Sequence, residues 1–182
     1  MNLNQTPAAE RPHIGFFGCR NAGKSSIVNA VTGQNLAVVS NVKGTTTDPV
    51  VKAMELLPAG PVVMIDTPGI DDDGELGKLR VEKSYQMLNR TDLAIVVIDG
   101  GTGIKKEDFA LLKEIEKRKV PFIIAVNKSA LLKEHRIQSK GRGKVPEESL
   151  IYVSAETGEG IRELKKRIGE SICTEKNKKR IV

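Results

Sequence analysis

Short apolar runs of strand length alternate along the chain with segments of amphipathic character. Six such runs cover residues 13–18, 49–57, 61–67, 92–99, 121–128 and 149–155. Four of them, all except the second and third, are almost continuously apolar, as are the strands of a buried parallel sheet. The turn sequence Pro-Ala-Gly separates the second run from the third, which predicts an antiparallel hairpin.

Four segments between or after these runs have the spacing of helices. The first, 24–33, ends in a glycine, which is a common helix stop. The others, 76–90, 106–119 and 160–172, repeat apolar residues every three or four positions: Leu76, Leu79, Tyr85 and Leu88; Phe109, Leu112 and Ile115; Ile161, Leu164, Ile168 and Ile172. Strands alternating with helices predict an α/β fold: a mainly parallel six-stranded sheet with one antiparallel hairpin and helices on both faces.

Composition narrows the class of protein. The chain has 182 residues, of which 39% are hydrophobic and only 3% aromatic, so its core is expected to be aliphatic. The net charge of +6 comes partly from the C-terminal end, but no aromatic residues are interleaved there, which favours a solvated surface over a nucleic-acid site.

Two cysteines, Cys19 and Cys173, are too few for a disulfide framework. With no apolar run of membrane-span length and no signal-peptide core, we expect a cytoplasmic protein without a membrane partner.

The sequence GCRNAGKS, residues 18–25, follows a predicted strand and precedes a predicted helix. This is the setting of a phosphate loop, in which glycines let backbone N–H groups point at phosphate oxygens and the helix N-terminus adds positive charge. Lys24 is expected to bridge the β- and γ-phosphates, and the Ser25 hydroxyl to ligate Mg²⁺. The expected nucleotide-binding residues here are Gly18, Asn21, Ala22, Gly23, Lys24, Ser25 and Ser26.

Two further motifs follow the expected edge of the sheet. The sequence DTPG, residues 66–69, ends the third run, and we expect Asp66 to hold Mg²⁺ and the Gly69 N–H to meet the γ-phosphate. A simple turn is the alternative for this composition. The threonine-rich loop NVKGTTTDP, residues 41–49, is placed to close on Mg²⁺ and the γ-phosphate.

The motifs GCRNAGKS, GTTTD, DTPG, NKSA and SAETG occur in the order found in translation-factor-like GTPases, and over residues 12–172 the chain resembles their Era and TrmE group. In finer detail it resembles the GTPase domain of the HydF family, which matures FeFe-hydrogenase. Two features carry that finer likeness: the Asp-Pro at 48–49 and the run GELGKLRVEK at 74–83. Neither is a general GTPase feature.

The resemblance implies a P-loop NTPase with a Ras-like G domain that binds GTP or GDP, Mg²⁺ and K⁺. It assigns Mg²⁺ to Ser25, Thr46 and Asp66, and K⁺ to Asn21 with the backbone around Ser40 and Val42. Capping or a turn is the alternative role for Asn21. Catalysis would rest on Lys24, Thr46, Gly69 and Asn21, and recognition of the base on Asn127, Lys128, Ser154 and Ala155.

A Ras-like catalytic glutamine would follow Gly69, where this chain has Ile70. Glu75 is a candidate for orienting water, and the alternative is an acidic residue in the first turn of a helix. We therefore expect slow intrinsic turnover.

The base-reading motif Asn-Lys-x-Asp ends here in Ala130, which lacks the carboxylate that accepts hydrogen bonds from guanine. Three interpretations remain open. The alanine is an engineered loss of specificity, a natural drift, or the mark of a domain that binds nucleotide loosely and acts as a gate.

The expected organisation is an N-terminal extension at 1–11, a GTP-binding domain at 12–173 and a basic tail at 174–182. The resembled family carries further dimerisation and iron–sulfur domains, so the expected partners are those domains, partner maturases and a guanine nucleotide, with a dimer of the isolated domain possible. No iron–sulfur cluster is expected in this chain. The alternatives are an RNA- or ribosome-associated GTPase and a non-catalytic, nucleotide-gated interaction module.

Overall fold

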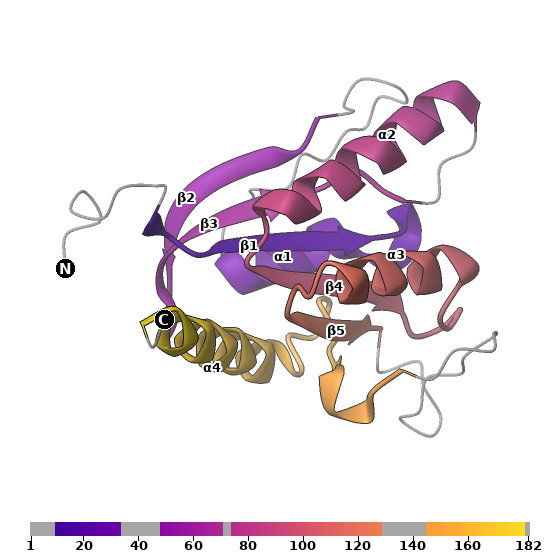
Figure 1. Ribbon diagram of the computed structural model, residues 1–182. Helices are drawn as coiled ribbons and strands as arrows, with labels where there is room; N and C mark the ends of the chain where they lie inside the picture. Colours follow the sequence, from indigo (N-terminus) through magenta and orange to yellow (C-terminus); the bar gives the residue numbers. More distant parts are fainter. Residues whose placement is uncertain (1–9, 34–47, 71–73, 129–144, 181–182) are drawn as a thin grey trace.

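A six-stranded sheet forms the centre of the molecule in the computed structural model, which describes residues 10–33, 48–70, 74–128 and 145–180 (Figure 1). The strand order is β2-β3-β1-β4-β5-β6. All neighbours pair in parallel except β2 and β3, which form the predicted antiparallel hairpin. The strands are β1 (His13–Gly18), β2 (Val50–Leu56), β3 (Gly60–Asp66), β4 (Leu93–Asp99), β5 (Phe122–Asn127) and β6 (Leu150–Tyr152).

Helices cover both faces of this sheet, as the alternating pattern predicted (Figure 1). They are α1 (Lys24–Thr32), α2 (Gly74–Met87), α3 (Lys106–Lys117) and α4 (Ile161–Arg180). Side chains of β4 alternate between two buried clusters because successive strand residues point to opposite faces. Ile95 and Val97 pack in the cluster that holds α1 and α4, whereas Val96 and Ile98 pack in the cluster that holds α3 and the end of α2.

The apolar face predicted for α2 is partly wrong. Leu79 is 43% exposed. Among the α2 side chains whose burial the structure describes, the buried positions are Gly77, Ser84 and Met87, with Leu88 just beyond the end of the helix. Residues 77, 84 and 88 lie seven and four positions apart and so share one face, while position 79 lies on another. Small and polar residues on the buried face hid this pattern from a search for large apolar side chains.

The face predicted for α4 is confirmed, but its length is not. Its four predicted apolar residues are at most 8% exposed, yet the helix continues to Arg180, well past the expected end at 172. Most of the basic segment 174–182 is therefore helical. Lysine, arginine and glutamate have good helix propensity, and the Lys179 Nζ lies 3.1 Å from an Asp92 carboxylate oxygen.

The last strand is shorter than the predicted run 149–155, since β6 ends at Tyr152. The residues that follow form the loop that carries Ser154 and Ala155 to the candidate site. No helix within the described part of the chain is long and apolar enough to cross a membrane.

Candidate nucleotide site

The phosphate loop runs from the end of β1 to the start of α1 and demands glycine at two positions. Gly23 has a left-handed φ of 80°, and a Cβ there would lie 2.2 Å from the Asn127 Nδ2. A Cβ on Gly18 would lie 2.5 Å from the Val97 carbonyl oxygen. Both contacts are far shorter than van der Waals distance. The two glycines of the motif are thus required by close approach of β4 and β5 as well as by the curl of the loop.

Lys24 and Asp66, the groups expected to hold phosphate and Mg²⁺, contact each other in this structure. The Lys24 Nζ donates to an Asp66 carboxylate oxygen, and only 8% and 12% of the two side chains are exposed. Each charge neutralises the other while both are buried. In the roles predicted for them, the ammonium turns to the phosphates and the carboxylate to the metal ion, so nucleotide binding would replace this ion pair.

The DTPG turn is fixed to the phosphate loop by its backbone. The Thr67 hydroxyl donates to the Phe16 carbonyl over 2.6 Å, and the Ile70 N–H donates to the Gly18 carbonyl over 3.3 Å. Gly69 therefore lies directly beside the loop, where a γ-phosphate contact was predicted. Ile70 is 4% exposed and belongs to the core, so the position of a Ras-like glutamine offers no polar group to a water molecule.

Asn127 joins its own loop to two others around the site, the phosphate loop and the Ser-Ala loop. Its side chain is buried; the Nδ2 donates to the Ala22 carbonyl over 3.0 Å, and the Oδ1 accepts the Ala155 N–H over 3.2 Å. The N–H of Ala155, a residue expected to take part in base recognition, is thus bonded to Asn127 in this structure. Ser154 is also buried and accepts the Thr157 N–H through its hydroxyl. The bonds of Asn127 hold the start of the Asn-Lys loop against the phosphate loop and the Ser-Ala loop.

Lys128 lies in the left-handed region, with φ of 61°, and its Nζ bonds two groups. It donates to the Asn21 carbonyl over 3.3 Å and to the Asp99 Oδ2 over 2.5 Å. A non-glycine residue in this conformation is uncommon and tends to occur at functional sites. The bonds direct the lysine stem across the mouth of the site toward the phosphate loop.

Asp99 is a site residue that the sequence analysis missed. Burial raises the pKa of its carboxyl, but hydrogen bonds from Lys128 and the Gly101 N–H outweigh that effect and bring the pKa below its usual value. The carboxylate therefore stays charged and anchors Lys128. Its position at the end of the run 92–99 was the available signal, because ligand-binding residues of open α/β sheets gather at the carboxyl ends of strands.

A second missed contact ties the loop to α3. The Cys19 thiol donates to the Asp108 Oδ1 over 3.5 Å, and the Lys105 N–H donates to the Oδ2 over 2.8 Å. Asp108 is 2% exposed, and burial raises the pKa of its carboxyl despite both hydrogen bonds. Neither Cys19 nor Cys173 forms a disulfide.

The remaining predicted site residues differ in their exposure, and some lie outside the described part of the chain. Asn21 and Ser26 are exposed at the loop, Ser25 is half-buried, and Ala22 is buried. Glu75 is exposed in the first turn of α2, the position that its alternative role requires. Some predicted residues fall outside the described residues: Thr46, Ser40, Val42 and Ala130.

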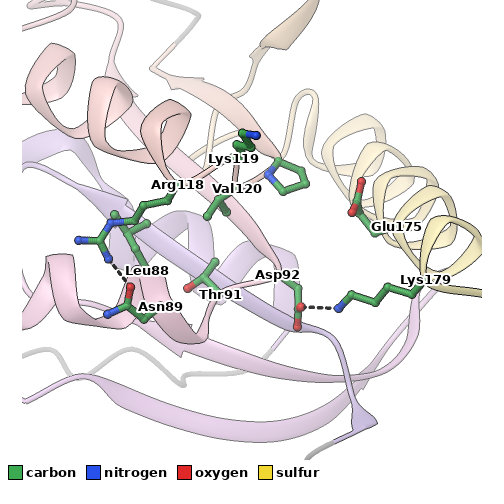
Figure 2. A pocket seen from close by; sticks show the side chains of 10 residues that line it. Leu88, Asn89, Thr91, Asp92, Arg118, Lys119, Val120, Glu175 and Lys179 are labelled. Carbon is green, nitrogen blue, oxygen red and sulfur yellow. Dashed lines mark hydrogen bonds and ion pairs between the residues drawn. The ribbon is translucent and has the colours of Figure 1, made fainter. Parts of the chain in front are cut away.

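A cavity of about 350 Å³ lies at the opposite end of β4 and β5 (Figure 2). Thr91, Asp92 and Pro121, which precede these strands, line it together with Arg118 and Lys179. No residue of the phosphate loop lines this cavity, so it is separate from the candidate nucleotide site. Within the described residues, no group of three or more His, Cys, Asp or Glu side chains is placed to hold a metal ion.

A phosphate loop after β1, an acidic turn after β3 and an Asn-Lys loop after β5 together define a P-loop nucleotide-binding domain. The chain belongs to the family described as 50S ribosome-binding GTPase, whose sequence pattern matches residues 13–128. It is accordingly a GTPase domain, and its family implies GTP or GDP with Mg²⁺ as ligands.

Curated relatives agree with this assignment. The tRNA modification GTPase MnmE of Heliobacterium modesticaldum is 36% identical over 82% of this chain and 32% of its own length. The GTPase Der of Limosilactobacillus reuteri is 32% identical over 84% of this chain and 38% of its own length. The chain thus spans about a third of the length of the curated relatives it matches.

The fold is that of solved GTPases. The crystal structure of Era from Aquifex aeolicus, bound to GDP.AlF4-, superposes with a TM-score of 0.69 at 23% identity, and the match covers 87% of this chain and 56% of that one. At this level of identity the likeness establishes the fold alone, and it confirms the Ras-like G domain expected from the sequence.

Proposed function

We propose that this domain hydrolyses GTP with Mg²⁺ and K⁺ and acts as a nucleotide switch in the maturation of FeFe-hydrogenase. One observation carries the catalytic part: Lys24, Asp66 and Asn127, from three separate motifs, converge on the phosphate loop. In this proposal residues 12–173 form the GTP-binding domain, with 1–11 and 174–182 as flanking segments. Turnover is slow, and the expected cytoplasmic location stays a prediction.

Two features support a role for a monovalent cation. Ile70 is buried, so the usual water-orienting position supplies no polar group, and developing charge in the transition state needs another source of stabilisation. Asn21 is exposed at the edge of the phosphate loop, and its backbone carbonyl accepts a hydrogen bond from Lys128. In our proposal its side chain and backbone from the segment around Ser40 and Val42 hold K⁺ there.

The test is GTP turnover by the purified chain in matched K⁺ and Na⁺ buffers at fixed Mg²⁺. We expect the rate in K⁺ to be at least about tenfold higher than in Na⁺. This corresponds to K⁺ lowering the activation barrier by roughly 1.4 kcal/mol or more through stabilisation of charge in the transition state. Asn21→Ala should abolish the difference, whereas Asn89→Ala, an exposed asparagine of the distant cavity, should keep it. Equal rates in both salts would rule out the cation role, and absence of any turnover would leave a non-catalytic, nucleotide-gated module.

The hydrogenase part of the proposal draws on the two features shared with that family. Asp48, from the Asp-Pro at the end of the threonine-rich loop, forms an ion pair with Lys83 of the run 74–83, with 2.5 Å between the Nζ and the carboxylate oxygen. The two features therefore meet in space, although 35 positions separate them in sequence. We propose that this contact links the threonine loop to α2, and that downstream domains or partner maturases read its state.

A second function competes with this one, because the relatives at 36% and 34% identity are named tRNA modification GTPases. The two are separated by deleting the gene in its host and measuring hydrogenase activity and, by mass spectrometry, the modified nucleosides of total tRNA. Loss of hydrogenase activity with intact tRNA supports the maturation role. Loss of a tRNA modification with intact hydrogenase would replace it with the RNA-associated role.

A further inference from the structure

Arg20 occupies one of the variable positions of the phosphate loop and contacts the DTPG turn. A Cβ built on Gly69 would lie 2.4 Å from the Arg20 Cγ and 3.1 Å from its backbone nitrogen. The stem of Arg20 therefore covers Gly69 at the place where a side chain would otherwise stand. Arg20 itself is exposed and begins the short 3₁₀ helix Arg20–Ala22.

Arg20 is a cationic residue beside Gly69, whose N–H is expected to contact the γ-phosphate. Ile70, next to Gly69, turns into the core and presents no polar group. Arg20 thus adds a charge to the γ-phosphate side of the loop that the phosphate-loop motif does not specify.

We propose that the Arg20 guanidinium binds the γ-phosphate and thereby makes the domain prefer GTP over GDP. Its planar fork of donors matches phosphate oxygens, and charge-assisted hydrogen bonds of this kind are strong. Because its stem rests on Gly69, an arginine held by the γ-phosphate also holds the DTPG turn beside the loop. After hydrolysis and loss of phosphate, this restraint on the turn ends. The inference rests on the proposed GTPase function and adds a residue that reads the third phosphate.

The experiment compares dissociation constants for GDP and for a non-hydrolysable GTP analogue, both with Mg²⁺. Arg20→Met keeps the apolar stem over Gly69 and removes the charge, so it separates packing from phosphate recognition. We expect the variant to bind the analogue roughly 10- to 100-fold more weakly, the usual effect of losing a charged hydrogen bond, while GDP affinity stays within about twofold. Arg20→Lys should fall between the two, because it keeps a point charge without the fork.

The matched control is Arg162→Met, which removes an exposed arginine of α4 and should leave both affinities unchanged. If Arg20→Met weakens GDP and the analogue equally, the residue only shapes the loop and the proposal is wrong. Unchanged affinities for both ligands would also overturn it. A wild-type chain that binds neither nucleotide would remove the proposed function itself, and with it this inference.

Discussion

At the scale of single residues, the buried ion pair of Lys24 and Asp66 makes the stability of the fold depend on both charges. Asp66→Asn leaves the Lys24 ammonium in its buried position without a carboxylate. Breaking a buried ion pair from one side costs about 3–5 kcal/mol, so we expect a loss of that order in the free energy of unfolding. Urea unfolding without nucleotide measures it.

Asp48→Asn is the control for this prediction, because it removes a carboxylate whose side chain is 76% exposed. An exposed ion pair contributes at most about 1 kcal/mol, so this variant should unfold almost as the wild type does. Equal losses in the two variants would show that burial of the Lys24–Asp66 pair carries no special cost.

Ala130 gives a gain-of-function prediction at the same scale. The frame that presents the base-reading loop is intact, since Asn127 bonds Ala22 and Ala155 on its two sides. Ala130→Asp restores an acceptor for the guanine N1–H and N2–H₂, and charged hydrogen bonds contribute about 1.5–3 kcal/mol each. We expect GTP affinity to rise at least about tenfold while ATP affinity stays unchanged.

Competition against a fluorescent guanine nucleotide measures both affinities, and XTP serves as the informative competitor. Xanthine carries an oxygen in place of the guanine amino group, so the new carboxylate should not favour it. A rise in affinity for all three nucleotides would show that the substitution acts on the loop rather than on base selection. A wild-type chain that already prefers GTP by roughly a hundredfold would mean that the remaining residues of the site read guanine without a carboxylate at position 130.

How far the site was predictable depends on whether a residue is specified by local spacing. Gly18, Gly23 and Lys24 follow from a contiguous motif, and the structure places them around one loop. Asp99 and Asp108 escaped notice because their partners are distant: Lys128 lies 29 positions from Asp99, and Cys19 lies 89 positions from Asp108. Arg20 escaped because the motif allows any residue at its position.

At the scale of elements, Asp108 connects the phosphate loop with the start of α3. Its carboxylate accepts the Lys105 N–H at the helix N-terminus and the Cys19 thiol in the loop. Because burial raises the pKa of Asp108 above its unfolded value, its contribution to stability is fully present below the unfolded pKa. That contribution is lost as the pH rises through the folded pKa.

We therefore predict a pH-dependent difference between the wild type and Asp108→Asn, which cannot titrate. The free energy of unfolding of the wild type minus that of the variant should be largest near pH 4, about the unfolded pKa of an aspartate, and should decrease toward neutral pH. Urea unfolding of both proteins at a series of pH values gives this difference. A difference that grows with pH would mean that the two hydrogen bonds outweigh burial.

The helices show why element faces were easier to predict than element ends. On α4 four aliphatic residues repeat at helical spacing, and all four are buried. The end of that helix was missed because residues 174–180 are polar and continue the helix through backbone propensity and surface contacts, which no apolar pattern records. On α2 the buried Ser84 donates to the Pro68 carbonyl, a tertiary bond that periodicity does not reveal.

At the scale of the whole molecule, the sheet brings separate motifs to one edge. In the strand order β3-β1-β4-β5, the carboxyl ends carry in turn Asp66, Gly18, Asp99 and Asn127. Parallel strands make these ends neighbours, although the residues span more than half of the chain. The cavity in Figure 2 lies at the other ends of β4 and β5, so the nucleotide edge and this cavity are separated by the length of the strands.

Because the loops around the site all follow strands of this one sheet, nucleotide binding should stabilise the whole domain. A ligand at 100 times its dissociation constant adds about 2.7 kcal/mol to the free energy of unfolding. For a chain of this size that corresponds to a rise in Tm of roughly 5–10 °C. We expect GTP with Mg²⁺ to give this rise in a thermal unfolding scan and GTP with EDTA to give clearly less, because the metal ion is expected to bridge phosphates and protein.

Ser25→Ala tests which residue carries the metal-dependent part of that rise. Ser25 is half-buried beside Lys24, and its loss should leave the fold and the binding of metal-free GTP intact. In this variant the Tm in GTP should then be nearly the same with Mg²⁺ and with EDTA. Ser26→Ala, the next and exposed serine, is the matched control and should keep the difference. If the wild type responds equally to GTP in Mg²⁺ and EDTA, the nucleotide binds without the metal and the assignment of Ser25 and Asp66 as its ligands is wrong.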